Sequence, residues 1–114
     1  DRIALDSIRS IQSDAAPDLL AQVVRIYLES TPALIARLRL AFASVDHEAI
    51  RIAAHTLESS SANLGANVLA ELCKKLELAA RARSIGPEVP GLNQIENAFA
   101  AVRGALLAEL GTTP

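Results

Sequence analysis

Apolar residues recur at the spacing of an α-helix along most of this chain, and this periodicity restricts the fold more than any other feature. Leucine, isoleucine, valine and alanine return every three or four residues, which places them on one face of a helix. No segment alternates between apolar and polar residues with the period of two that a half-buried strand requires. The sequence therefore predicts an all-α fold built from amphipathic helices.

Prolines mark the start of helices in the first half of the chain. A short first helix is expected over residues 5–12, and Pro17 suits the first turn of a second helix, where its missing N–H costs nothing. Thr31 and Pro32 repeat this start signal, because a hydroxyl can cap a helix and proline favours its first position. The sequence leaves open whether Pro32 kinks one long helix or separates two.

The second half of the chain contains three further helices with clear boundary residues. Asp46 can cap the first of them and Gly65 can end it. The next is expected over residues 68–83, and the last ends at Gly111. Because short connections join the long helices, neighbouring helices should run antiparallel. We expect residues 1–114 to form one domain, an up-down antiparallel four-helix bundle with an additional short N-terminal helix.

Composition restricts the partners and the compartment. The net charge of −2, without a basic stripe, argues against nucleic-acid binding. Cys73 is the only cysteine, so no internal disulfide can form, and a cytoplasmic setting is favoured. There is no long charge-free apolar run, so we expect no membrane contact by this domain. The chain starts at Asp1 and has no methionine, and we interpret it as part of a longer protein that could itself be membrane-anchored.

The helix that follows Asp46 has a two-sided pattern. At about 100° per residue, its core face is centred on Leu57. The other core-face residues are Ile50, Ala53, Ala54, Ser61 and Leu64. His55 lies two positions before Leu57 and therefore points about 160° away from the core centre. The residues around it on the outer face are Glu48, Arg51, Ile52, Ser59 and Ala62.

An exposed histidine suits covalent phosphoryl transfer. With an ordinary pKa of about 6.5, imidazole is a good nucleophile near neutral pH, and it can carry a phosphoryl group. The phosphorus must be attacked in line, which a convex helix with small neighbours permits. The chain has no glycine-rich phosphate loop and no carboxylate cluster suited to magnesium, so the sequence predicts no cofactor and no metal site. The helical pattern alone is also compatible with an exposed histidine that has no functional role.

Residues 54–66, AHTLESSSANLGA, resemble the signature of histidine phosphotransfer domains. That signature is roughly Ala-His-Thr/Ala-Leu-Lys-Gly/Ser-Ser-Ser/Ala, followed by Leu/Val-Gly. Residues 72–77, LCKKLE, and then Ala80 and Arg81 are similar to the family's next helix. The resemblance implies a phosphorelay in which His55 takes a phosphoryl group from one receiver-domain aspartate and gives it to another. It implies a bacterial two-component system, with a hybrid sensor histidine kinase as the parent and this domain as an intermediate rather than an independent enzyme.

One position departs from the signature. The family usually has lysine three residues after the histidine, whereas this chain has Glu58. A carboxylate there would repel a phosphohistidine, although salt and exposure screen the repulsion. Ser59, where many members have glycine, is a smaller departure. Arg51, one turn before His55, and Arg81, which can pair with Glu58, are the available cations.

Geometry places Glu77 near His55, because the chain reverses near Gly65 and the two residues lie at similar heights on adjacent helices. On the helical wheel Glu77 flanks the edge of the core. By resemblance, Glu77 and Arg81 lie beside the histidine. An alternative of equal weight to a functional role is that Glu77 and Arg81, four positions apart, form an ordinary surface ion pair.

Two other functions remain open beside the carrier. The first is a protein-binding module in which Glu58 has weakened or abolished phosphotransfer. The second is a structural bundle, which would bury Ile52 against a second copy. A dimerising kinase domain is disfavoured because Thr56 follows the histidine and no proline appears between His55 and Pro87, and nothing indicates a separate enzyme pocket. For a carrier, we expect a receiver domain to bind over Glu48, Ile52 and Ala62.

Overall fold

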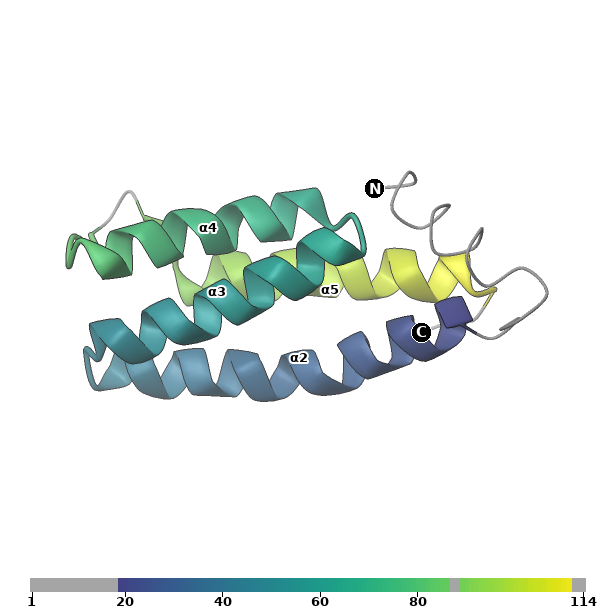
Figure 1. The fold of residues 1–114 in the computed structure, drawn as a ribbon, viewed down its shortest axis with the longest axis horizontal. Coiled ribbons are helices and arrows are strands. Elements are labelled where there is room, and N and C mark those ends of the chain that lie inside the picture. The colour runs from purple at the N-terminus through teal and green to yellow at the C-terminus, as the bar shows by residue number, and fades with distance from the viewer. Residues whose placement is uncertain (1–18, 87–88, 112–114) are drawn as a thin grey trace.

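Four α-helices form an antiparallel bundle in the computed structural model, which describes residues 19–86 and 89–111 (Figure 1). They are α2 (Leu19–Ala43), α3 (His47–Asn63), α4 (Asn67–Arg81) and α5 (Leu92–Glu109). α3 packs against α2 and α4, and α5 closes the bundle by contacting the same two helices. The expected all-α four-helix bundle is confirmed, whereas the helix expected over residues 5–12 and Pro17 lie outside the described residues.

α2 is one continuous helix of 25 residues, with Pro32 inside it. The side chain of Pro32 is exposed, so the ring does not interrupt the buried face of the helix. The hydroxyl of Thr31 donates to the carbonyl of Tyr27, one turn earlier, at 2.6 Å. A hydroxyl that donates to a carbonyl of the preceding turn has its hydrogen-bond partner within the same helix, and it does not cap the start of a second helix. The structure therefore decides for one long helix over two separate ones.

The core is a cluster of mainly aliphatic side chains from all four helices. Leu38 of α2, Leu57 of α3, Leu76 of α4 and Ile95 of α5 have almost no exposed surface. Among the described helices, α2 is the one long and apolar enough to be a membrane-span candidate by length and composition. Its buried apolar residues belong to this core, whereas Ile26 and Leu40 of the same helix are exposed.

Capping interactions define both ends of α3. The side chain of Asp46 accepts a backbone N–H of the first turn at 3.0 Å. At the other end Gly65 has a φ of +74°, the left-handed region that favours glycine. The N–H of Gly65 bonds the carbonyl of Ala62, and the N–H of Ala66 bonds that of Ser61, which together make a Schellman motif. Both boundaries predicted from the sequence are confirmed.

A buried hydrogen bond joins α2 to α3. The hydroxyls of Tyr27 and Ser61 are 2.7 Å apart, and both side chains are buried. The ring of Tyr27 also packs edge-on against Phe99 of α5, with the centroids 5.9 Å apart. Burial raises the pKa of Tyr27 above its ordinary value, which keeps the phenol protonated. Because a buried hydroxyl without a partner is costly, this bond favours one register of α3 against α2.

We expect Tyr27→Phe to lower the free energy of unfolding by about 1–2 kcal/mol, because it deprives the buried Ser61 hydroxyl of its partner. Ser61→Ala should have a similar effect, and the double variant should lose less than the sum of the two. Urea unfolding followed by circular dichroism measures all three. Ser60→Ala is the control, since its hydroxyl bonds the Leu57 carbonyl within α3. Strictly additive losses would show that the two hydroxyls are not coupled.

Candidate functional site

His55 lies midway along α3, on the side that faces away from the core. Its side chain is 57% exposed, whereas Ala54 and Leu57 are completely buried. The residues expected on the core face are all buried: Ile50, Ala53, Ala54, Leu57, Ser61 and Leu64. The predicted orientation of the helix is therefore confirmed, and the ring of His55 is open to an approaching molecule.

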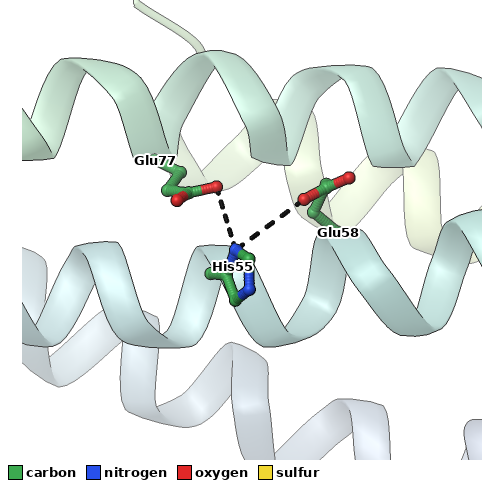
Figure 2. Close-up of side chains that lie close together, drawn as sticks. All are labelled: His55, Glu58 and Glu77. Atoms are coloured by element: carbon green, nitrogen blue, oxygen red, sulfur yellow. Dashed lines mark hydrogen bonds and ion pairs between the residues drawn. The ribbon is translucent and has the colours of Figure 1, made fainter.

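Glu77 of α4 is a buried carboxylate that points at His55 (Figure 2). Only 8% of its side chain is exposed, and its Oε1 atom lies 3.2 Å from Nδ1 of His55. Its other oxygen accepts a hydrogen bond from Arg81, one turn further along α4, at 2.8 Å. Buried carboxylates require partners of this kind. The structure thus brings together the two residues that the sequence placed at the same height, with Glu77 between His55 and Arg81.

The contact with Glu77 determines which ring nitrogen of His55 faces solvent. An ionised carboxylate can only accept hydrogen bonds, so Nδ1 of His55 must be the donor. We assign the proton to Nδ1 on this ground. In a neutral ring Nε2 then has the free lone pair. The arrangement presents a nucleophilic nitrogen on the exposed side of the ring.

Glu58 is a second carboxylate near the ring, one turn after His55 on α3. Its Oε1 atom lies 3.9 Å from Nδ1 of His55, which is an ion-pair distance but too long for a hydrogen bond. The sequence allowed Arg81 to pair with Glu58 or with Glu77, and the pair with Glu58 is not among those formed by the described residues. Arg81 pairs with Glu77 instead, because residues four apart on one helix lie on the same stripe. That arginine therefore does not neutralise Glu58.

Arg51 and Glu48 form a paired patch on the outer face of α3. The guanidinium of Arg51 donates to both carboxylate oxygens of Glu48, at 2.8 and 2.7 Å. The hydrogen bond from Arg51 lowers the pKa of Glu48 below its ordinary value. The cation that the sequence placed one turn before His55 is therefore engaged by Glu48. Ser59 and Ala62, the other expected outer-face residues, are exposed on α3.

A groove of about 360 Å³ lies between α2 and α3 and extends to the residue next to His55. We call it the α2–α3 groove, and its lining includes Leu34, Leu40, Ala41, Ile52, Ala53 and Thr56. Leu40 and Ile52 are 72% and 52% exposed and line the same groove, so they give it an apolar surface. The sequence singled out Ile52 but missed Leu40, because only the packing of the two helices reveals that they share a surface.

Comparison with known proteins identifies the family. The family model described as "Hpt domain" matches residues 22–105. The chain belongs to the Hpt domain family. This Hpt domain is 24% identical over 102 residues to histidine-containing phosphotransfer protein 2 of Arabidopsis thaliana, a match that covers 87% of the chain but only 65% of that protein. The crystal structure of histidine-containing phosphotransfer protein B from Pseudomonas aeruginosa matches it with a TM-score of 0.83 and 30% identity, over 96% of this chain and 91% of that one.

We expect nitrogen NMR of the metal-free protein to find the His55 proton on Nδ1. The measurement concerns the neutral ring, in which only one of the two nitrogens has a proton. Glu77→Ala removes the acceptor and should shift the proton toward Nε2. Glu58→Gln is the control and should leave the tautomer unchanged, because its distance of 3.9 Å is too long for a hydrogen bond. A ring protonated on Nε2 in the unaltered protein would contradict the assignment.

Proposed function

We propose that this Hpt domain is a phosphorelay carrier, which accepts a phosphoryl group from a receiver-domain aspartate onto His55 and passes it to another. The observation that carries the proposal is the hydrogen bond between the exposed ring and the buried carboxylate of Glu77, which leaves Nε2 free. Membership of the Hpt family supports it, and both similar proteins bear the name histidine-containing phosphotransfer protein. We extend the proposal to residues 1–114 as one domain.

The transfer needs only one nucleophile from this chain. The lone pair on Nε2 attacks the phosphorus of the aspartyl phosphate, a nitrogen–phosphorus bond forms, and the bond to the aspartate oxygen breaks to release a carboxylate. The ring gains positive charge while Nδ1 keeps its proton, and the carboxylate of Glu77 stabilises that charge. Onward transfer reverses these events: a second aspartate oxygen attacks the phosphorus, and the electron pair returns to Nε2.

The cations that phosphoryl transfer requires are assigned to the receiver. Negative charge on the transferring oxygens has to be neutralised for the reaction to proceed. Around His55, however, Arg51 is engaged by Glu48 and Arg81 by Glu77. We therefore propose that the receiver supplies a metal ion and cationic side chains, and that the Hpt domain is an intermediate and not an independent enzyme.

We propose that the receiver docks over the outer face of α3 and the α2–α3 groove. Exposed Ile52 and Leu40 offer an apolar contact, with Glu48 and Ala62 also on the outer face of α3.

A cytoplasmic location fits the buried free thiol of Cys73, whose pKa burial raises to about 12, so that the thiol stays protonated and unreactive. A bacterial hybrid sensor kinase remains our proposed parent.

Glu58 supports a second candidate function, that of a docking module that binds receivers without accepting a phosphoryl group. Its carboxylate lies 3.9 Å from Nδ1 of His55 and would repel a phosphoryl group on the same ring. The two candidates differ in one measurable respect. A carrier becomes labelled by a phosphorylated receiver, whereas a docking module binds the receiver and stays unlabelled.

We expect His55→Gln to abolish phosphoryl acceptance and to change the free energy of unfolding by no more than about 0.5 kcal/mol, since the ring is exposed and the buried Glu77 keeps Arg81 and can accept from the glutamine amide. The measurement is incubation with a receiver domain carrying radiolabelled phosphate. Label on the unaltered protein should be acid-labile and base-stable, as phosphohistidine is. His47→Gln serves as the control and should be labelled normally. Label retained by the His55→Gln protein would exclude His55 as the acceptor.

We expect Ile52→Asp to weaken receiver binding by about tenfold or more, because it places a charge in the apolar contact. Titration calorimetry with the cognate receiver measures the affinity. Ile26→Asp is the matched control: Ile26 is also an exposed isoleucine, on α2, about 21 Å along the helix from Leu40. Equal affinity of the Ile52→Asp and Ile26→Asp proteins would remove the α2–α3 groove from the docking surface.

A further inference from the structure

His55, Glu58 and Glu77 place three potential metal-ligand atoms within 4.8 Å of one another (Figure 2). α3 supplies the imidazole and one carboxylate, and α4 supplies the other carboxylate. We propose that these residues bind a divalent transition-metal ion, with Zn²⁺ as the representative, through Nδ1 of His55 and one oxygen of each glutamate. The sequence analysis placed Glu77 at the height of His55 and Glu58 three residues after it, but it predicted no metal site.

The distances fit a tetrahedral ion. Zinc bonds of about 2.0–2.2 Å to nitrogen and oxygen, at tetrahedral angles, place neighbouring donor atoms about 3.3–3.5 Å apart. Nδ1 of His55 lies 3.2 Å from Glu77 Oε1 and 3.9 Å from Glu58 Oε1. All three donor atoms lie within 4.8 Å of one another, so binding requires side-chain rotations that bring the two carboxylates closer together. The ring is 57% exposed, so a water molecule can take the fourth position.

The charges at the site also favour a cation. Glu77 is neutralised by Arg81, but the one ion pair that Glu58 forms within the described residues is with His55, which is charged only when protonated. The Glu58 side chain is 26% exposed, and one of its carboxylate oxygens faces the ring (Figure 2). A partly buried carboxylate without a full cationic partner is unfavourable, and a divalent ion would offset that cost.

The donor types indicate which metals fit. Imidazole is a good ligand for zinc, copper and nickel, whereas magnesium and calcium prefer an all-oxygen environment. Arg81 holds the second oxygen of Glu77 at 2.8 Å and so keeps Oε1 directed at the ring. Outer contacts of this kind orient ligands in metal sites. The donor set of the site is therefore matched to a transition metal.

Metal binding would prevent the transfer proposed above, and this consequence rests on that proposed function. A metal on Nδ1 uses the lone pair of that nitrogen, so the proton of the neutral ring must move to Nε2. Nε2 then has no lone pair with which to attack phosphorus. The ion need not cover the nucleophilic atom, because it removes the nucleophile by changing the tautomer. The metal and the incoming phosphoryl group thus compete for one ring.

Binding is tested first on the protein alone, by titrating ZnCl₂ into the metal-free Hpt domain in a calorimeter. We expect one ion per chain, and Glu58→Gln should weaken binding by about tenfold or more, a loss that even outer-shell changes can cause. His55→Gln should abolish binding at this site. Glu71→Gln, which removes an exposed carboxylate elsewhere on α4, is the matched control and should bind normally. Nitrogen NMR should show the His55 proton on Nε2 once zinc is bound.

Absence of one-to-one binding, or binding unchanged in Glu58→Gln or His55→Gln, would overturn the proposal. The second arm measures labelling by a phosphorylated receiver with and without zinc. We expect zinc to suppress labelling of the unaltered domain, a chelator to restore it, and the Glu58→Gln protein to resist the same zinc concentration. Equal suppression of both proteins would refute the competition. If the unaltered domain takes no label without zinc, the carrier proposal fails, while calorimetry still tests the metal site.

Discussion

The packing of Leu57 and its neighbours into the core is the constraint on which the rest of the site depends. Residues two apart on a helix point in nearly opposite directions, so burial of Leu57 forces His55 outward. The packing of α4 against α3 then brings Glu77 to the ring. Polar contacts at an exposed surface add little stability by themselves. Apolar packing therefore positions the reactive groups, and their hydrogen bonds only refine the geometry.

The features that the sequence predicted correctly depend on short stretches of chain. The cap at Asp46, the glycine turn at Gly65 and the outward direction of His55 each follow from a few neighbouring residues. The continuity of α2 could not be predicted, because the same Thr-Pro pair can begin a helix or lie inside one.

The errors and omissions at the site concern contacts between helices. Arg81 had two carboxylates within reach, and side-chain geometry selected Glu77 over Glu58. Leu40 became part of a surface only when α2 lay beside Ile52. The Glu58 carboxylate, 3.9 Å from Nδ1 of His55, acts in opposite senses on the two ligands proposed for the ring, because negative charge repels a phosphoryl group and attracts a cation.

The turn at Gly65 gives the site a kinetic property. His55 and Glu77 are 22 residues apart, so both belong to a single helical hairpin. Contacts between residues close in sequence lose little chain entropy on forming and re-form rapidly after opening. The α2–α3 groove also lies within one helical hairpin, since Leu40 and Ile52 are 12 residues apart. Detachment of α4 would therefore take Glu77 away from the ring and leave the groove in place, whereas detachment of α2 would remove the groove and leave the His55–Glu77 pair.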